Sequence, residues 1–384
     1  MSKKVWIAIV VIAVISLGTG FYIYLGTRSQ SPSPTSSISG PLKVEEGVSP
    51  ETREPDDGPD IEIVAENLEI PWEVAFLPNG ELLVTERPGR LIKIGKERKV
   101  YEISGVRDVG EGGLLGLALH PDFKNNQLIY LYLTSSDAGK IVNRVERYRL
   151  ENDSLINREV ILEGIAGASN HDGGRIEFGP DGFLYITTGD AQKPNLAQDI
   201  NSLNGKILRV KDDGSIPPDN PFGNAVYSYG HRNVQGITWD SEGRLWATEH
   251  GRSGLLSGLD ELNLIEPGKN YGWPDIQGDE TREGMVAPII HSGASETWAP
   301  AGAEFIKDSI FFTGLRGSTL YQAKIENENV TTLVKHFENQ YGRLRAVRLG
   351  PDGYLYITTS NQDGRGPPRQ GDDKIIRINP RIFR

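Results

Sequence analysis

One histidine stands between a polar loop and a glycine pair in the stretch "ASNHDGGRIEFGPDGFLYITTGDA", which runs from Ala168 to Ala191. Histidine is the residue type whose intrinsic pKa best suits a general base near neutral pH. A carboxylate follows at Asp190, where the next apolar run ends. If the two side chains meet, the carboxylate can fix the imidazole tautomer and stabilise the imidazolium. Taken alone, His171 is more typical of a solvated loop, and Asp190 is equally typical of a turn cap.

Cationic and hydrogen-bonding side chains occur at four further places in the chain. They are "YGHRNVQG" at 229–236, "TEHGRSG" at 248–254, "GLRGS" at 314–318 and "YGRLRAV" at 341–347. The formal net charge of the chain is −11, which argues against non-specific binding of nucleic acid or anionic lipid by the globular part. A cationic pocket in such a chain predicts a small polyanionic ligand.

These segments must be positioned by strands, because one hairpin pattern recurs along the chain. In each copy a hydrophobic strand ends, a turn such as Pro-Asp-Gly follows, and an alternating apolar strand leads to a polar tail. The copies begin at Phe76, Leu119, Phe178, Trp239, Glu304 and Leu349. Their spacing of roughly 40 to 65 residues is typical of propeller blades. The sequence therefore predicts an all-β fold, a six-bladed β-propeller with four-stranded antiparallel blades, whose loops bring the polar segments together on one face.

The N-terminal part differs in composition from the rest. Residues 1–27 carry Lys3 and Lys4 before an apolar run and predict a signal anchor or signal peptide. Because no small-x-small cleavage site follows, an uncleaved anchor is favoured, with the bulk of the protein outside the cytoplasm. Residues 28–60 predict a Ser/Pro-rich and then acidic linker, and residues 61–384 the propeller. With 0 cysteines, no disulfide or thiolate metal site is available.

At longer motifs the chain resembles the soluble pyrroloquinoline quinone (PQQ)-dependent glucose and aldose sugar dehydrogenases. The similarity extends from about Ile70 to Ile378 and includes "GEGGLLGLALHPDFKNN", "HDGGRIEFGPDG", "YSYGHRNVQGITW", "DELNLIEPGKNYGWP" and "GRLRAVRLGPDG". The resemblance implies a six-bladed propeller that holds the quinone and calcium near its axis. It also implies oxidation of aldoses at the anomeric carbon to lactones, by hydride transfer to the quinone.

The resemblance implies a role for each matching polar residue. His171 would be the catalytic base, and Asp190 would orient its imidazole. Arg232 would polarise a quinone carbonyl and stabilise the charge that develops there, and Asn233 would contact the quinone beside it.

Further residues would hold the cofactor's carboxylates. Arg343 and Arg345 alternate along one strand and match the family's bidentate arginines, although two such arginines alone are more typical of a solvated surface. Arg316 stands where the family usually has lysine, which keeps the charge but not the shape. Glu111 stands where the glucose-oxidising members have glutamine. Its carboxylate would repel the quinone unless it is protonated or turned toward an arginine or calcium.

Calcium is the second ligand that the resemblance implies. One ion would be bound by the main-chain carbonyls of Gly251 and Arg252, where the family often has proline at the second position. A structural calcium would fall near Glu261 and Tyr271, and calcium accepts such oxygen ligands at relaxed geometry. The alternative is that Glu261 is an ordinary loop acid.

Two other functions remain open from the sequence. Six-bladed propellers also host calcium-dependent lactonases and esterases, and a surface-anchored propeller can bind without turnover. A hydrolase would need Asn, Asp and Glu ligands on the axis, and a binding module predicts no ordered pair of His171 and Asp190. Loops such as 279–298 are shorter than in the glucose enzymes, so we expect broad aldose use and a monomer. The sequence does not identify the electron acceptor.

Overall fold

The computed structural model describes residues 58–254 and 257–383. The predicted anchor and most of the predicted linker therefore lie outside the described residues. Among the residues that are described, no helix is long and apolar enough to cross a membrane. The strands begin at Ile61.

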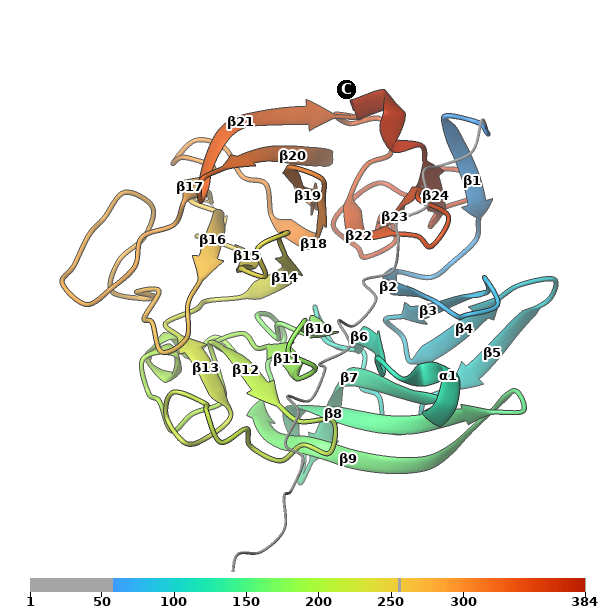
Figure 1. Cartoon of the computed structure of the whole chain (residues 1–384), viewed down its shortest axis with the longest axis horizontal. Coiled ribbons are helices and arrows are strands. Elements are labelled where there is room, and N and C mark those ends of the chain that lie inside the picture. Colours follow the sequence, from blue (N-terminus) through green and yellow to red (C-terminus); the bar gives the residue numbers. More distant parts are fainter. Residues whose placement is uncertain (1–57, 255–256, 384) are drawn as a thin grey trace, which may run out of the picture. The chain divides into compact units, whose positions relative to one another are not determined.

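The described chain forms six four-stranded antiparallel sheets arranged as blades around a central axis (Figure 1). The prediction of an all-β, six-bladed propeller is confirmed. From the inner to the outer strand, the blades are β2 (Pro71–Phe76), β3 (Leu82–Glu86), β4 (Arg90–Ile94) and β5 (Arg98–Glu102); β6 (Leu114–Leu119), β7 (Leu128–Asp137), β8 (Lys140–Glu151) and β9 (Ser154–Ala166); β10 (Ile176–Phe178), β11 (Leu184–Thr187), β12 (Lys206–Val210) and β13 (Val226–Tyr229); β14 (Val234–Trp239), β15 (Leu245–Glu249), β16 (Glu261–Ile265) and β17 (Ile290–His291); β18 (Pro300–Ile306), β19 (Ser309–Gly314), β20 (Thr319–Glu326) and β21 (Asn329–His336); β22 (Leu344–Leu349), β23 (Leu355–Thr359), β24 (Ile375–Ile378) and β1 (Ile61–Ala65).

Within the described residues, helical structure is confined to short segments outside the sheets. The described residues contain one helical turn, α1 (Phe123–Asn126), and the short 3₁₀ segments η1 (Pro194–Ala197) and η3 (Pro380–Phe383).

Each of the six recurring hairpins forms the inner pair of strands of one blade. In blade three, Phe178 of β10 pairs with Leu184 of β11, and the turn between them needs Gly182 at a φ of 78°. The hairpin turns lie at one end of the strands. The segments with candidate site residues, such as His171 before β10 and Asp190 after β11, lie at the other end. The hairpin pattern therefore places these segments on the same face of the propeller.

The ring is closed by the N-terminal strand. β1 pairs with β24 in an antiparallel ladder from Ile61 opposite Ile378, so it is the outermost strand of the last blade. Asp60 adds an ion pair of 2.7 Å with Arg381. The closure joins the two ends of the described chain within one sheet.

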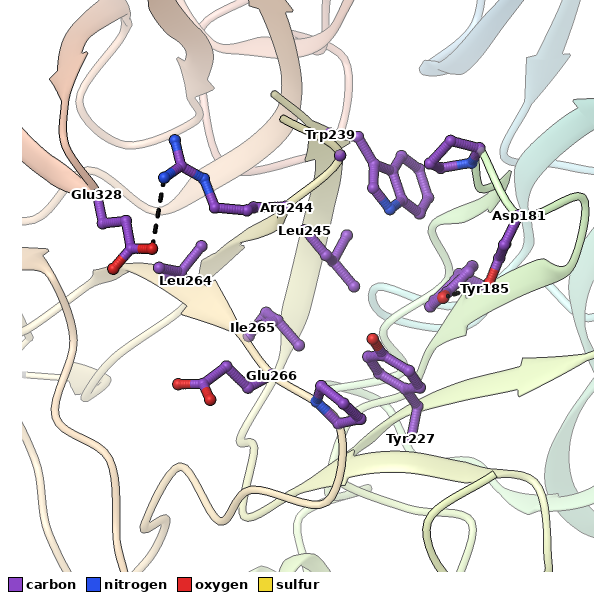
Figure 2. A pocket seen from close by; sticks show the side chains of 13 residues that line it. Asp181, Tyr185, Tyr227, Trp239, Arg244, Leu245, Leu264, Ile265, Glu266 and Glu328 are labelled. Atoms are coloured by element: carbon purple, nitrogen blue, oxygen red, sulfur yellow. Dashed lines mark hydrogen bonds and ion pairs between the residues drawn. The ribbon is translucent and has the colours of Figure 1, made fainter. Parts of the chain in front are cut away.

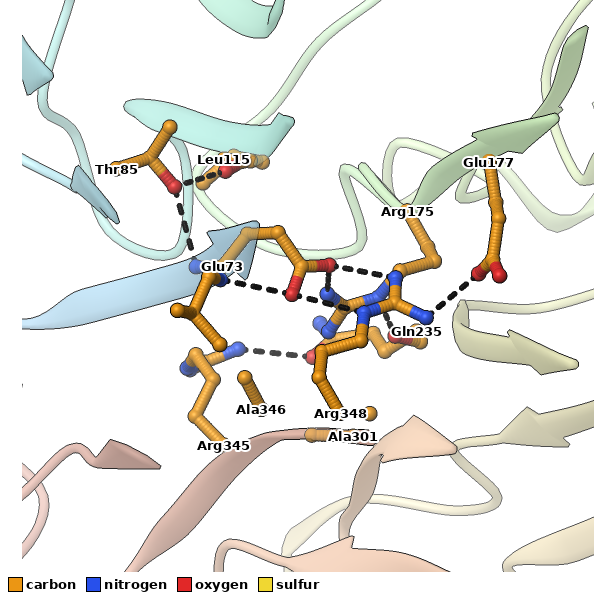
Figure 3. A network of polar contacts seen from close by, with 12 residues as sticks. Glu73, Thr85, Leu115, Arg175, Glu177, Gln235, Ala301, Arg345, Ala346 and Arg348 are labelled. Atoms are coloured by element: carbon orange, nitrogen blue, oxygen red, sulfur yellow. Dashed lines mark hydrogen bonds and ion pairs between the residues drawn. The ribbon is translucent and has the colours of Figure 1, made fainter. Parts of the chain in front are cut away.

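A buried ionic cluster fills the central channel between the inner strands (Figure 3). Glu73 of β2 is fully buried and binds Arg175, which precedes β10, and Arg348 of β22. Arg348 also donates to Glu177 of β10 at 2.7 Å. Burial alone would raise the pKa of Glu73, but the two guanidinium groups hold that pKa below its ordinary value. The cluster therefore keeps its charges paired inside the protein.

One cavity lies on the hairpin-turn side of the propeller (Figure 2). Its volume is about 520 Å³, and its lining includes the aromatic rings of Tyr185, Tyr227 and Trp239. At its edge, Arg244 and Glu328 form an ion pair of 3.4 Å. This cavity is at the opposite end of the strands from His171 and Asp190.

Candidate active site

The structure brings together the histidine and the aspartate that the sequence singled out. His171 Nδ1 lies 2.8 Å from Asp190 Oδ1, while the other carboxylate oxygen accepts a hydrogen bond of 2.9 Å from Trp273 Nε1. The side chain of Asp190 is 1% exposed and that of His171 is 16% exposed. Asp190 also caps a turn, because Oδ1 accepts the amide of Gln192 at 2.8 Å. With Nδ1 occupied by Asp190, Nε2 of His171 is the ring nitrogen left to accept a proton.

The backbone of His171 is held in the left-handed region, at a φ of 64°. Such a conformation is uncommon for a residue other than glycine and persists only where neighbouring groups fix it. The amide of His171 donates to Glu111 Oε2 at 3.0 Å, and its carbonyl accepts the amide of Ala191 at 3.1 Å. A Cβ on Gly189 would collide with that carbonyl. Glycine at 189 therefore permits the close approach of the His171 backbone to the Asp190 segment.

The structure answers the question raised by the carboxylate at Glu111. Oε1 of Glu111 accepts a hydrogen bond of 2.5 Å from Nη1 of Arg365. Burial opposes ionisation of this carboxyl group, but His250, Arg365 and the His171 amide together hold its pKa at about 2. Glu111 is therefore an ionised carboxylate turned toward an arginine.

Arg232 and Asn233 lie in the segment beside Asp190. The carbonyl of Arg232 accepts the Asp190 amide at 2.8 Å, and Asn233 Oδ1 accepts the Gly173 amide at 3.0 Å. The guanidinium of Arg232 donates to Ser253 Oγ at 2.6 Å and lies over the ring of Trp273. Burial lowers the pKa of Arg232, against the charges of nearby carboxylates including Asp190.

Side chains that contact His231 and the Arg232 amide hold the segment of Arg232 in place. His231 lies between Glu249, 2.8 Å from its Nδ1, and Ser228, 2.8 Å from its Nε2. Glu249 also accepts the backbone amide of Arg232. The ring of Tyr271 stacks on His231 at 4.8 Å between centroids. These contacts fix the backbone from which the Arg232 side chain extends.

The two arginines of the last blade have different partners. Arg343 donates from Nε to Asp363 Oδ2 at 2.9 Å. Arg345 donates to Gln235 Oε1 at 3.0 Å and lies over the ring of Trp72. Burial lowers the pKa of Arg345 to about 9. Arg345 therefore presents a buried guanidinium whose hydrogen-bond partners are neutral.

The candidate calcium residues fall into two groups. The Gly251 amide donates to Asp260 Oδ1 at 2.8 Å, and Arg252 forms an isolated bridge with Gly258. Glu261 pairs with Glu249 across β15 and β16, and burial together with the Glu249 charge raises its pKa to about 8.

The hydroxyl of Tyr271 is directed away from that carboxylate pair. It donates to the carbonyl of Leu264 at 2.7 Å and accepts the amide of Glu266 at 2.8 Å. Both hydrogen bonds of the Tyr271 hydroxyl are therefore made with backbone groups. Among the described residues, no group of three or more His, Asp and Glu side chains is placed to hold a metal ion.

Arg316 is the most peripheral of the predicted site residues. It follows β19, and its Nη1 donates to Ser257 Oγ at 2.8 Å in an exposed contact. The contact joins blade five to the loop after Gly251. Its guanidinium is therefore at the edge of the cluster formed by the other arginines.

Several residues that contribute to the site were given no role from the sequence, although Trp273 and His250 lie within motifs quoted above. Trp273, Asp363 and Arg365 reach the site from loops in other blades. His250 lies directly before Gly251 and is half-buried, and its buried Nε2 has no hydrogen-bond partner. Burial lowers the pKa of His250 to about 4. The nearby Arg232 and Arg345 lower it further, whereas the carboxylates of Asp260 and Glu111 oppose the shift. In the sequence, the position of His250 directly before Gly251 is the feature that could have indicated its place in the site.

The fold and the site together define a class of propeller that gathers cationic side chains around a histidine and aspartate pair on one face. The family model described as Glucose / Sorbosone dehydrogenase matches residues 68–376. The chain belongs to this family.

Individual relatives agree with this assignment. Aldose sugar dehydrogenase YliI of Escherichia coli (strain K12) is 32% identical over 358 residues, covering 84% of this chain and 93% of the relative. The PQQ-bound form of aldose sugar dehydrogenase from Streptomyces coelicolor has a TM-score of 0.77 and 38% identity, over 84% of this chain and 98% of that structure. A putative oxidoreductase (glucose dehydrogenase) of Thermus thermophilus has a TM-score of 0.79 and 42% identity, over 83% and 98% respectively.

Proposed function

We propose that this protein oxidises aldose sugars at the anomeric carbon to lactones, with PQQ as the hydride acceptor. The observation that carries the proposal is the pair of His171 and Asp190, joined at 2.8 Å and facing a cluster of buried cationic groups. Membership of the dehydrogenase family supports the reaction class.

The residues of the chain divide the reaction between them. His171 Nε2 takes the proton of the anomeric hydroxyl while the C–H bond of the same carbon breaks, and the sugar becomes a lactone. Asp190 keeps the proton on Nδ1 and stabilises the imidazolium that forms. Arg232, held by Ser253, stabilises negative charge that develops on an oxygen next to it. The quinone, when bound, accepts the hydride.

The donor set of the site suits an anionic quinone. Arg343 and Arg345 supply guanidinium groups for its carboxylates, and Arg232 supplies one for a quinone carbonyl. Buried polar atoms without a hydrogen-bond partner include Asn233 Nδ2, His250 Nε2 and Arg252 Nε. Such atoms are rare in folded proteins, and a ligand with several oxygen atoms would supply partners for the two that are donors, Asn233 Nδ2 and Arg252 Nε.

Calcium is proposed as a second component. Because no three acidic or histidine side chains converge among residues 58–254 and 257–383, an ion near the quinone would rely on carbonyls such as those of Gly251 and Arg252. A structural ion would rely on Glu261 with Glu249, where a cation would relieve the repulsion that raises the Glu261 pKa.

The alternatives have less support. A calcium-dependent lactonase needs convergent Asn, Asp and Glu ligands on the axis, whereas no three acidic or histidine side chains converge among the described residues. A binding propeller without turnover does not need the ordered contact between His171 and Asp190.

The test is reconstitution of purified apo-protein with PQQ and calcium, followed by measurement of sugar-dependent dye reduction. Aldoses should give reduction only when the quinone is present, and His171→Gln should bind the quinone but reduce little dye. Binding of PQQ without any sugar-dependent reduction would contradict the proposed activity.

Location and partners remain proposals from the sequence. The enzyme would lie outside the cytoplasm, anchored by residues 1–27, and would act as a monomer on small aldoses.

A further inference from the structure

One half-exposed arginine is connected to the backbone of the proposed base through a single carboxylate. Arg365 lies in the loop between β23 and β24, and its side chain is 49% exposed. Its Nη1 donates to Glu111 at 2.5 Å, and its Nη2 donates to Asn170 Oδ1 at 2.8 Å. The other oxygen of Glu111 accepts the amide of His171. Three segments far apart in the sequence therefore meet at one guanidinium.

The loop that carries Arg365 is fixed at its base. Asp363 Oδ1 accepts the amide of Arg365 at 3.0 Å, and Asp363 Oδ2 accepts Nε of Arg343 at 2.9 Å. A Cβ on Gly366 would lie 2.6 Å from Cδ of Arg343, so glycine allows the loop to pack on that arginine. Arg365 is therefore presented to Glu111 by a backbone that Arg343 and Asp363 hold in place.

We propose that Arg365 is a positioning residue for the proposed base, and that it acts through Glu111. The inference rests on the proposed function, because His171 is the base only in that reaction. Arg365 keeps the carboxylate of Glu111 directed at His171, and the charge-assisted hydrogen bond from the amide holds His171 at its φ of 64°. Without Arg365, the carboxylate, only 15% exposed, has lost its bound cation and turns away from the His171 amide.

An ordinary surface ion pair would behave differently. Exposed pairs contribute about 0–1 kcal/mol to stability and can be removed without consequence. The contact of Arg365 differs because its partner is mostly buried and is itself bonded to the left-handed residue. The expected effect is therefore on turnover and not on the fold.

The experiment compares Arg365→Gln with Arg369→Gln in the quinone-loaded enzyme. Arg369 belongs to the same loop but donates to main-chain carbonyls, including that of Asn339 at 2.9 Å. Loss of a group that orients a functional residue typically costs about 10–100-fold. We expect Arg365→Gln to lower kcat by about 10-fold, with KM and quinone affinity nearly unchanged, and Arg365→Lys to recover part of the loss. Arg369→Gln should behave as the parent.

A double substitution tests the route through Glu111. An amide oxygen at this position can accept the His171 amide without a cation beside it. In the Glu111→Gln background, Arg365→Gln should therefore cause no further loss of kcat. An equal loss in both backgrounds would overturn the inference.

A measurement without quinone separates this inference from the proposed function. The amide of His171 should exchange with solvent about 10-fold faster in Arg365→Gln than in the parent or in Arg369→Gln. If the His171 amide exchanges faster in Arg365→Gln but the parent oxidises no sugar, the link from Arg365 to His171 stands and the proposed sugar oxidation is rejected. Unchanged exchange in Arg365→Gln would reject the link, whatever the activity.

Discussion

Two groups of buried arginines lie along the same axis and have opposite surroundings. In the central channel, Arg348 contacts Glu73 at 2.8 Å and Glu177 at 2.7 Å, and these carboxylates raise its pKa. In the candidate site, Arg345 and Arg232 donate to neutral groups, and burial lowers the pKa of each. A buried charge is costly unless it is paired. Arg348 is therefore paired with carboxylates within the protein, whereas Arg345 and Arg232 have no bonded carboxylate, which supports the proposal that the site group binds an anionic ligand.

The largest expected effect concerns the base in the site group. His171→Gln keeps a hydrogen-bonding side chain but cannot accept the proton, so kcat should fall by about 10²–10⁴-fold. Quinone affinity, measured by titration of the apo-protein, should stay within about twofold because the arginines are untouched. Asp190→Asn should lower kcat less, because the base remains. Turnover near the parent rate in His171→Gln would show that His171 is an ordinary loop residue and not the base.

The next effect should appear in the channel group and in stability. Glu73→Gln leaves Arg175 and Arg348 without their shared carboxylate, and breaking a buried pair in this way costs about 3–5 kcal/mol. Urea unfolding should show this loss. The control is Glu62→Gln, which removes an exposed partner of Arg377 and should cost less than about 1 kcal/mol. Similar losses in the two variants would contradict the division between paired and unpaired arginines.

A smaller effect should separate ligand binding from stability in the site group. Arg345→Met removes a guanidinium that has no carboxylate within bonding distance, so the free energy of unfolding should stay the same or increase. Quinone affinity should fall by about 10–100-fold, which corresponds to one or two charge-assisted hydrogen bonds. Arg343→Ala should weaken binding less, because Asp363 already occupies one edge of that guanidinium. Unchanged affinity in both variants would remove these arginines from the site.

The smallest effect is a pH dependence of the channel group. Burial, with the charge of Glu177, raises the pKa of Glu304 to about 8, while Arg348 opposes the shift. The native carboxyl thus keeps a proton that the unfolded chain loses near pH 4.5. Its contribution to stability is complete below that value and is lost as the pH rises through about 8. Unfolding measured between about pH 5 and pH 8 should show this decline, and Glu304→Gln should flatten it. The side chain of Glu304 is 20% exposed, so water screens its charge, and the decline should be smaller than a fully buried carboxyl group would show.

The propeller could be predicted because its information is local and repeated. Each hairpin carries its own turn residues and alternating pattern, and six copies specify six blades. The closing strand could not be predicted in the same way. β1 precedes the first hairpin and pairs with β24, which lies at the other end of the described chain. No local sequence pattern predicts a pairing between segments so far apart.

The site was predictable only where residues belong to a motif. His171 and Asp190 are recognisable because one hairpin separates them, and the structure joins them. Glu111 raised a question that the sequence left open, since its answer lies with Arg365 at the other end of the chain. Trp273 and Asp363 act across blades in the same way. Long-range partners depend on the ring being assembled, and single-sequence patterns do not encode them.

The pairing of β1 with β24 also affects how the protein unfolds. A linear array of repeats has free ends, from which it can unravel one unit at a time. In this chain the last sheet contains both the first and the last strand, so the ring presents no terminal repeat. Separation of β1 exposes the edge of β24 and weakens both neighbours of the last blade at once. The six blades should therefore melt as one cooperative unit, and heating should preserve or destroy the whole site in a single transition.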